Sequence, residues 1–201
     1  MTTIAVLDYG SGNLHSVARA IAAVGGAPVV TGDPAAVERA DAVVIPGVGH
    51  VGACVRAIRQ RGLDRSIAAS VDGGRPVFGV CVGMQVLLER SAEDAEPCLG
   101  VVPGACRRLA GDVKVPHIGW NTVTWSRPHP YIDGIPDDTR FYFVHSYAPE
   151  PDDATVGTTE HGRTFAAVLA RHNVFATQFH PEKSGDAGLA IYERFVQAVA
   201  A

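Results

Sequence analysis

A cysteine between two glycines is the first feature of the sequence that could carry chemistry. Residues 76–89 form an apolar run that predicts a strand leading into an amphipathic helix, with Cys81 at the junction and Gly79 and Gly83 on either side. A sharp strand-to-helix turn exposes a nucleophile, and glycines at these positions remove side chains that would clash there. A helix start also favours a thiolate and offers free N–H groups, including that of Val82. Taken alone, the pattern equally fits a small buried cysteine at a tight turn.

A histidine and a glutamate near the C-terminus could supply the base that a reactive cysteine needs. His180 and Glu182 follow an apolar strand and lie two residues apart, so in an extended segment they face the same side. Pro181 between them biases His180 toward extended geometry. A solvated strand end is the ordinary alternative for such a pair, but no other histidine has a carboxylate at this spacing after a strand. Together with Cys81 the pair predicts a nucleophile, a base and a residue that orients the base.

A loop of small residues follows the predicted strand 42–46 and leads into a helix. Its residues Gly47, Val48 and Gly49 expose backbone N–H groups. Loops at the carboxyl ends of neighbouring parallel strands converge, so this loop could face Cys81 and stabilise an oxyanion together with the Val82 amide. An ordinary strand-to-helix turn is the alternative.

A second glycine loop, residues 8–15, superficially resembles a dinucleotide-binding fingerprint, with Asp33 about twenty residues after its first glycine. His15 stands where the third glycine should be, so we do not favour nucleotide binding.

The elements that must position these residues alternate between strands and helices in the first half of the chain. Apolar runs predict strands at 4–8, 29–31, 42–46 and 76–81, and helical periodicity predicts helices at 14–24, 51–61 and 63–71. Many short β-like runs fill residues 99–179, and a last helix is predicted at 188–199. The pattern predicts an α/β fold with a doubly wound, mainly parallel central sheet, flanking helices and mixed or antiparallel strands added in the second half. We expect one domain over residues 1–201.

The bulk composition excludes several classes of partner. Lys and Arg number 17 against 21 Asp and Glu, a net charge of −4, and the positive residues are scattered, which argues against nucleic-acid and membrane-surface binding. Neither a signal peptide nor a transmembrane span is predicted, so we expect a cytoplasmic protein. The four cysteines form no C-x-x-C pair, which makes a zinc site or disulfide framework an unfavoured interpretation.

The combined motifs resemble those of class I, triad-type glutamine amidotransferases. The elbow of that family reads G-x-C-x-G-x-Q and its base region F-H-P-E, and both occur intact here at residues 79–85 and 179–182. Within the group the sequence is most similar to the glutaminase subunits of imidazole glycerol phosphate synthase. The segments that carry this second resemblance lie at residues 7–13, 46–49, 114–121, 141–147 and 176–184.

The resemblance implies a glutaminase that needs no cofactor or metal. Cys81, His180 and Glu182 would convert glutamine to glutamate and ammonia through a thioester, and the ammonia would pass to a (β/α)-barrel cyclase subunit in a heterodimer of histidine biosynthesis. Residues that would bind glutamine or its oxyanion are Gly47, Val48, Gly49, Val82, Gln85, His145, Ser146 and Tyr147. Residues that would contact the cyclase are Asn13, Pro116, His117, Trp120, Asn121 and Lys183.

Two other classes remain compatible with the residues. A cysteine hydrolase acting on γ-glutamyl or other acyl substrates would share the elbow and the base but would not need residues 116–121 for a partner. A binding module without catalysis would be expected to lack one of the three catalytic residues. All three are present, so we favour an enzyme.

Overall fold

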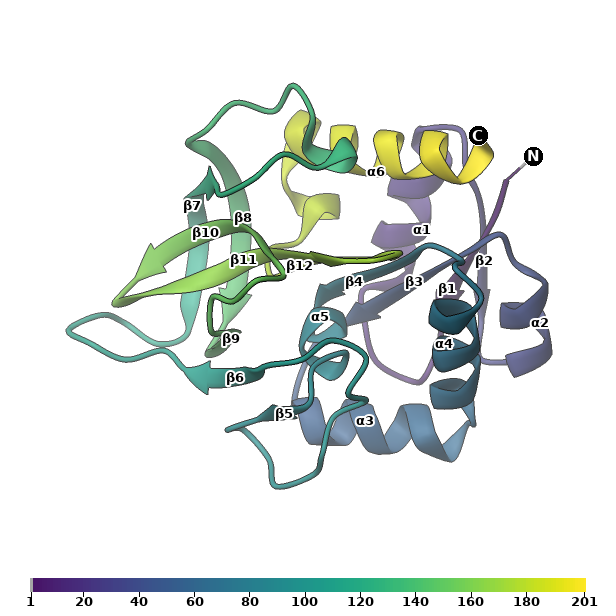
Figure 1. The fold of residues 1–201 in the computed structure, drawn as a ribbon, viewed down its shortest axis with the longest axis horizontal. Coiled ribbons are helices and arrows are strands. Elements are labelled where there is room, and N and C mark those ends of the chain that lie inside the picture. Colours follow the sequence, from purple (N-terminus) through teal and green to yellow (C-terminus); the bar gives the residue numbers. More distant parts are fainter. Residues whose placement is uncertain (1) are drawn as a thin grey trace.

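The computed structural model describes residues 2–201 and alternates strands and helices in the first half of the chain (Figure 1). The elements of this half are β1 (Thr3–Leu7), α1 (Leu14–Ala23), β2 (Ala27–Thr31), α2 (Pro34–Arg39), β3 (Ala42–Gly47), α3 (Val51–Gln60), α4 (Leu63–Asp72), β4 (Val77–Cys81) and α5 (Val82–Val86). The second half contains β5 (Arg90–Ser91), β6 (Ala105–Arg108), β7 (His117–Trp125), the 3₁₀ helix η1 (Pro130–Ile132), β8 (Thr139–His145), β9 (Tyr147–Pro149), β10 (Thr155–His161), β11 (Arg163–Arg171), β12 (Val174–Thr177), the 3₁₀ helix η2 (Pro181–Lys183) and α6 (Gly185–Ala200).

One large sheet organises the molecule, with strand order β2-β1-β3-β4-β12-β11-β10-β7-β8. The strands from β2 to β12 pair in parallel, and the pairs from β12 to β8 are antiparallel. A small second sheet has the order β5-β6-β9. The predicted α/β class with a parallel centre and antiparallel additions is therefore confirmed. Strand β12, which comes last in the sequence, lies between β4 and β11.

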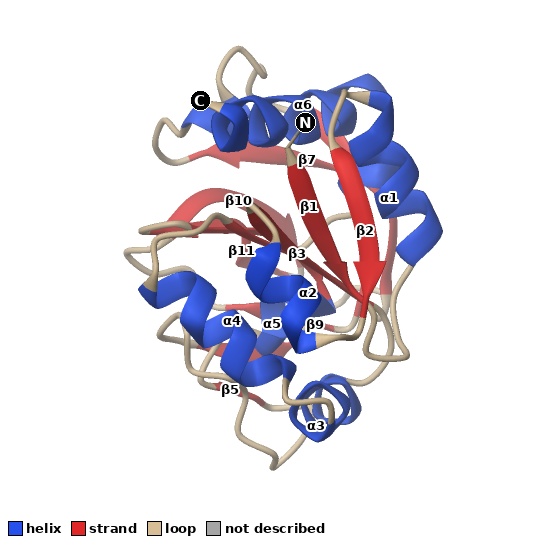
Figure 2. Cartoon of the chain, turned by 90° about the vertical axis from the view of Figure 1, so that its right-hand side faces the viewer, coloured by secondary structure: helices blue, strands red, loops and turns tan. Residues whose placement is uncertain are grey.

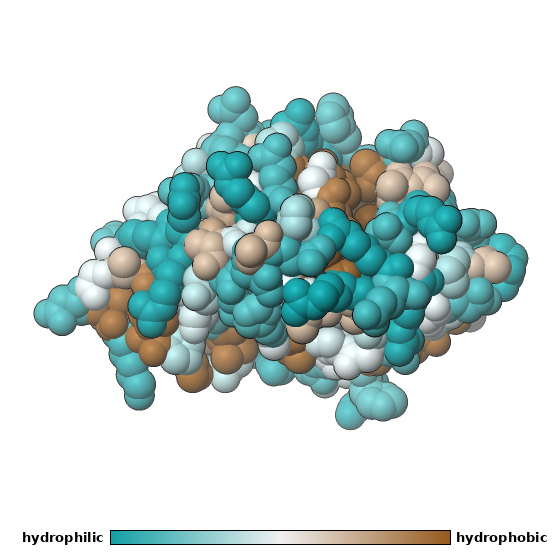
Figure 3. Space-filling view, turned by 90° about the horizontal axis from the view of Figure 1, so that it is seen from below, coloured by the Kyte–Doolittle hydropathy of each residue, from teal (hydrophilic) through white to brown (hydrophobic). Residues whose placement is uncertain are grey.

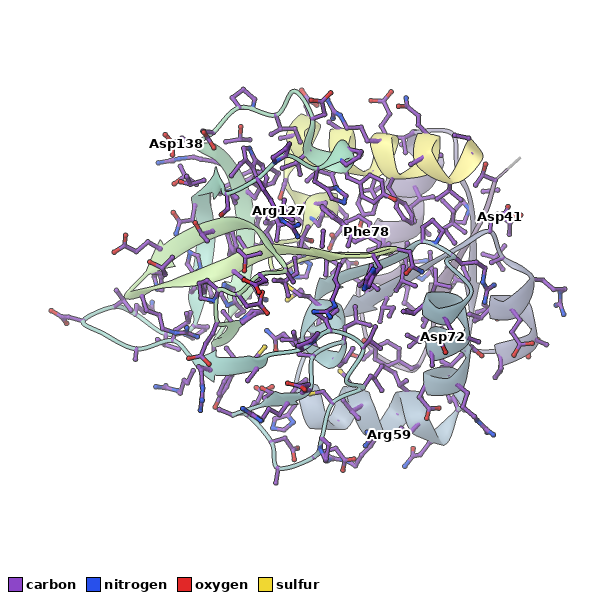
Figure 4. The ribbon with its side chains drawn as sticks, in the orientation of Figure 1. Asp41, Arg59, Asp72, Phe78, Arg127 and Asp138 are labelled. Carbon is purple, nitrogen blue, oxygen red and sulfur yellow. The ribbon has the colours of Figure 1, made fainter. Side chains whose placement is uncertain are left out.

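Helices cover both faces of the parallel strands (Figure 2). Helices α1 and α6 lie on one face, and α2, α3, α4 and α5 lie on the other (Figures 1 and 2). Parallel strands covered on both faces are apolar along their whole length, as β3 and β4 are. Phe78 of β4 is packed against α6, with its ring 5.4 Å from that of Phe195 and 5.1 Å from that of Phe175 on β12 (Figure 4).

Helix α5 is shorter than the amphipathic helix predicted up to residue 89. Its residues are all buried, and the carbonyls of Val86, Leu87 and Leu88 accept hydrogen bonds from the backbone of residues 99–102 instead of from a further helical turn. The chain after Val86 is therefore held by a loop from later in the sequence. With five residues, α5 also has little macrodipole to act on Cys81.

Helix α2 was not predicted, although its start signals are present in the sequence. Asp33 caps it by accepting a hydrogen bond from the Ala35 N–H at 3.0 Å, and Pro34 occupies the first helical position. The Asp33 carboxylate, which in a dinucleotide-binding fingerprint would contact a ribose, is thus a helix cap. Helix α6 is also longer than predicted at both ends, and Tyr192, Phe195 and Val196 lie on its buried face.

The lower surface of the molecule, around α3 and the β5 region, is covered mainly by hydrophilic side chains, with apolar ones scattered among them (Figure 3). Arg59 of α3 forms an ion pair with Glu96, and Arg56 of the same helix lies 3.3 Å from Asp94.

Among residues 2–201, no helix combines the length and apolar character that crossing a bilayer requires.

Candidate active site

Cys81 stands at a strained turn between β4 and α5. Its backbone adopts φ 55° and ψ −113°, which costs a non-glycine residue about 1–3 kcal/mol. The flanking glycines are required by space: a Cβ on Gly79 would lie 2.8 Å from the Gly83 carbonyl oxygen, and one on Gly83 would lie 1.7 Å from the Ile45 oxygen. The local geometry therefore agrees with the predicted elbow.

The loop of residues 47–49 lies beside this turn because β3 and β4 pair in parallel with Gly47 opposite Cys81. A Cβ on Gly47 would lie 2.5 Å from the Gly83 nitrogen, so only glycine allows the two turns to approach. Two side chains hold the loop from behind: the Tyr9 hydroxyl donates to the Pro46 carbonyl at 2.5 Å, and the Ser11 hydroxyl donates to the Val48 carbonyl at 2.6 Å.

His180 and Glu182 form a buried pair. His180 Nδ1 lies 2.8 Å from Glu182 Oε1, and both side chains are excluded from solvent. The prediction that they share a face of an extended segment is wrong in detail: His180 itself is extended, but residues 181–183 form a 3₁₀ turn that brings the carboxylate back to the ring. Ser184 closes the turn by donating to the His180 carbonyl at 2.6 Å.

The protonation of His180 is set by competing effects. Burial by itself lowers the pKa of the imidazole, but Cys81 and the hydrogen-bonded Glu182 outweigh it and raise the pKa to about 10. The other ring nitrogen, Nε2, is buried and has no hydrogen bond of good geometry to any described residue. Both neighbours therefore favour the protonated form of the His180 imidazole.

The three remaining cysteines are poor nucleophiles. All four cysteines are free and buried. Burial raises the pKa of the Cys54 thiol, raises that of Cys98 to about 11 and raises that of Cys106 well above its ordinary value. These residues stay protonated at neutral pH, which leaves Cys81 as the reactive candidate.

A cavity of about 430 Å³ opens in front of Cys81. It brings together ten of the residues singled out from the sequence, which are Val48, Gly49, Cys81, Val82, Gln85, Pro116, His145, Ser146, Tyr147 and Lys183. Glu93 and Val144 also line it and were missed. Glu93 accepts a hydrogen bond from the Val51 N–H at 2.8 Å, and its place after a short, weakly patterned strand gave no sequence signal. His180 and Glu182 do not line the cavity.

Two glutamine side chains lie under the cavity. Gln85 is buried, and its Nε2 lies 2.9 Å from both the Tyr147 carbonyl oxygen and Gln178 Oε1. Gln178 Nε2 lies 3.7 Å from Cys81 Sγ. Gln178 was not among the predicted site residues, although it stands two positions before His180.

A row of imidazoles continues from this cluster to β7. His145 Nδ1 lies 2.9 Å from the Tyr147 carbonyl oxygen, and His145 Nε2 lies 3.1 Å from His117 Nδ1. Asn121 Nδ2 lies 3.3 Å from His117 Nε2. Burial, and next the neighbouring His161, lower the pKa of His117 to about 4, and burial lowers that of His145 to about 3. Predicted as a surface residue, His117 is only 5% exposed and forms part of this buried row.

Two other residues predicted to contact a partner, Trp120 and Lys183, belong to an exposed, partly apolar surface. Trp120 on β7 is 51% exposed and Ile118 is 59% exposed. Trp120 pairs in register with Tyr142 of β8, and the Lys183 ammonium lies 5.8 Å from the centre of the Tyr142 ring. We call Ile118, Trp120, Tyr142 and Lys183 the hairpin surface.

Asn13 lies at the start of α1, next to Gly12, whose Cβ position is 3.3 Å from Pro46. It is therefore near the loop of residues 46–49 and not part of the hairpin surface.

A larger cavity of about 820 Å³ lies elsewhere, lined by residues 125–130 and 132–134. It includes His129, whose pKa burial and then Arg127 lower to about 4. None of the predicted site residues lines it. The part of the chain that the structure describes holds no group of three His, Cys, Asp or Glu side chains suited to a metal ion.

Known proteins resemble this chain over nearly its whole length. Residues 5–198 match the family described as "Glutamine amidotransferase class-I". The chain is 44% identical over 205 residues to the imidazole glycerol phosphate synthase subunit HisH of Microcystis aeruginosa, covering 99% of this chain and 97% of the relative. It is 48% identical over 207 residues to subunit HisH 1 of Pseudomonas aeruginosa, covering 98% and 97%. A crystal structure of a glutamine amidotransferase superposes with a TM-score of 0.77 at 19% identity, covering 98% of this chain and 99% of the other, so there the fold is what agrees. The chain therefore belongs to the class-I glutamine amidotransferases and, within them, to the family of HisH subunits of imidazole glycerol phosphate synthase.

Proposed function

We propose that this chain hydrolyses glutamine to glutamate and ammonia and supplies the ammonia to a cyclase subunit in histidine biosynthesis. The observation that carries the proposal is that Cys81 lines the 430 Å³ cavity and that the His180–Glu182 pair lies next to its side chain. Similarity to HisH subunits over nearly the whole chain supports the same activity. We propose one catalytic domain over residues 1–201.

In the proposed reaction the Cys81 sulfur attacks the side-chain amide carbon of glutamine. The carbonyl oxygen gains negative charge, which the N–H groups of Val82 and of the 47–49 loop stabilise. Glu182 holds Nδ1 of the imidazolium, so Nε2 is the end that gives its proton to the departing nitrogen, and ammonia leaves. The neighbours that raise the pKa of His180 to about 10 favour the protonated ring that this step needs.

The second half of the reaction regenerates the sulfur. Water attacks the thioester while His180, now neutral, accepts its proton, and the C–S bond breaks with its electron pair returning to sulfur. Glutamate leaves the cavity, and the imidazolium and thiolate are restored. Each step uses residues of this chain alone.

We assign the amino-acid end of glutamine to the far side of the cavity. Gln85 and the backbone of His145, Ser146 and Tyr147 line that side and supply polar groups. Glu93, which the sequence did not single out, adds a carboxylate that could accept from the substrate's α-ammonium group.

The partner is proposed to be a (β/α)-barrel cyclase that forms a heterodimer with this chain through the hairpin surface. Pro116, Asn121 and Asn13 would extend the contact, whereas His117 would act from beneath it because it is buried. Exposed aromatic side chains are enriched at protein interfaces. The free thiols of the chain favour a reducing compartment, and we propose the cytoplasm.

One assay tests the activity. Glutamate and ammonia are measured from glutamine with the chain alone and with its cyclase partner, for the wild type and Cys81→Ala. We expect turnover that Cys81→Ala abolishes. Turnover unaffected by the substitution would overturn the mechanism. Turnover that no cyclase alters, with γ-glutamyl compounds hydrolysed as fast as glutamine, would instead identify a general cysteine hydrolase.

A further inference from the structure

The amide of Gln178 is the polar side chain nearest the nucleophile that the proposed reaction does not use. Gln178 follows β12 directly, and its side chain is 0% exposed. Burying a primary amide costs free energy unless its groups are hydrogen bonded. Both ends of this amide have partners: Oε1 lies 2.9 Å from Gln85 Nε2, and Nε2 lies 3.7 Å from Cys81 Sγ.

Backbone chemistry fixes which end of each amide faces which neighbour. The Tyr147 carbonyl can only accept, so the atom of Gln85 that lies 2.9 Å from it is the –NH₂ group. That same –NH₂ has a second hydrogen, and it lies 2.9 Å from one end of the Gln178 amide, which must be the oxygen. The other end of Gln178, the one facing sulfur, is then necessarily a donor.

The sulfur has a competing neighbour of opposite character. The Val144 carbonyl oxygen lies 3.9 Å from Cys81 Sγ and can only accept, so it favours the protonated thiol. The Gln178 donor favours the charged sulfur, because hydrogen bonds to an ion are about twice as strong as those between neutral groups.

We propose that Gln178 is a further catalytic residue, whose side-chain N–H stabilises negative charge on Cys81 Sγ and which Gln85 holds in the donating orientation. This rests on the proposed glutaminase reaction. The donor acts twice: on the thiolate before attack, and on the sulfur that leaves when water opens the thioester. In the thioester the sulfur is neutral and the contact is weaker. The N–H group therefore stabilises the thiolate and the leaving sulfur more than it stabilises the thioester.

The decisive variant is Gln178→Glu. It keeps the shape of the side chain and an oxygen for Gln85, and an ionised carboxylate has no donor to offer the sulfur. Gln178→Met, which removes both polar ends at similar volume, is the second variant in case the first does not fold. Thr177→Val is the matched control, because Thr177 is equally buried and its hydroxyl donates to the Phe179 carbonyl at 3.0 Å without touching the sulfur.

Two rates are measured. The first is alkylation of Cys81 by iodoacetamide in the full chain from pH 5 to 9, followed by mass spectrometry of the Cys81 peptide. The second is kcat and KM for glutamine in the complex with the cyclase. At pH 7 we expect both Gln178 variants to slow alkylation by about tenfold or more and to lower kcat to a similar extent, with KM little changed. Thr177→Val should stay near the wild type in both.

The outcomes separate the two proposals. Wild-type alkylation and kcat in a folded Gln178 variant would overturn the role of Gln178, and so would an equal loss in Thr177→Val, which would indicate a structural effect. Alkylation does not depend on glutamine, so slower alkylation in the Gln178 variants alone would support the contact with sulfur even if the wild type failed to hydrolyse glutamine. That failure would count only against the proposed function.

Discussion

Glu182 Oε1 lies 2.8 Å from His180 Nδ1 inside a 3₁₀ turn in which the intervening residue is a proline. The turn places the carboxylate behind the ring, on the side away from the cavity. A carboxylate in this position fixes the ring orientation and the nitrogen that carries the mobile proton. Since both side chains are excluded from solvent, water cannot substitute for the carboxylate if it is lost.

Glu182→Gln should therefore remove most of the activity while preserving the fold. The amide has nearly the same volume but lacks the charge that stabilises the imidazolium, and we expect kcat for glutamine to fall by roughly 10³ to 10⁴. The measurement is steady-state hydrolysis in the complex with the cyclase, with circular dichroism as a check on folding. Glu193→Gln on the exposed side of α6 is the control and should leave kcat unchanged. An active Glu182→Gln protein would contradict the assigned role of Glu182.

Gly83→Ala should destabilise the protein strongly. The added methyl group would lie 1.7 Å from the Ile45 carbonyl oxygen, a backbone atom of β3 that cannot move without disturbing the sheet. We expect the free energy of unfolding to fall by about 3 kcal/mol or more. Gly100→Ala is the comparison: Gly100, unlike Gly83, has a positive φ, of 67°, but it has open space at its Cβ position, so its loss should be about 1–2 kcal/mol. Urea denaturation of both variants measures the difference, and equal losses would argue against a steric requirement at Gly83.

Acid should unfold the protein through its buried histidines. The pKa values of His117 and His145 are lowered in the folded state to about 4 and about 3, so the unfolded chain binds their protons first as the pH falls. The free energy of unfolding is unaffected by these two histidines above about pH 6.5 and falls as the pH is lowered toward 3. At pH 5 the loss of unfolding free energy is roughly 2 kcal/mol for each residue.

His180 behaves in the opposite sense. Its raised pKa of about 10 adds stability that is complete below about pH 6.5 and is lost as the pH rises through 10, so it does not change the acid limb. Unfolding free energies measured from pH 4 to 8 test the prediction. A flat profile between pH 5 and 6.5 would show that these imidazoles are not held neutral by the fold.

Trp120→Ala should weaken partner binding without weakening the fold. The side chain is half exposed and contacts Tyr142, the geometry expected of an interface anchor. We expect the Kd for the cyclase to rise by about 30-fold, equivalent to about 2 kcal/mol. Val29→Ala on the far edge strand β2, where Val29 is 42% exposed, is the control and should leave the Kd unchanged. Calorimetric titration of the two subunits provides the measurement, and an unchanged Kd for Trp120→Ala would exclude the hairpin surface.

Motifs with a local physical cause could be predicted from the sequence. The glycines on either side of Cys81, and Gly47, are required by short-range packing, and parallel pairing then brings them together. The alternation of strands and helices in the first half also predicted the sheet, because buried parallel strands and amphipathic helices have distinct patterns of apolar residues.

Features that depend on contacts distant in sequence could not be predicted. Helix α5 stops early because residues 99–102 occupy its last carbonyls, and His117 is buried because β7 and β8 place it beside His145. Gln178 was missed for the same reason: its importance lies in two neighbours, Gln85 and Cys81, that are more than ninety residues away.

The central position of β12 has a consequence for synthesis of the chain. The strand comes from residues 174–177, yet it joins the parallel strands to the antiparallel ones. In a ribosome-bound chain shorter than this, the strands on either side of β12 would form two separate sheet fragments with open edges at β4 and β11, and His180 would not yet be present. Completion of the sheet and of the proposed catalytic residues would therefore coincide, so we expect no glutaminase activity from a chain that ends before β12.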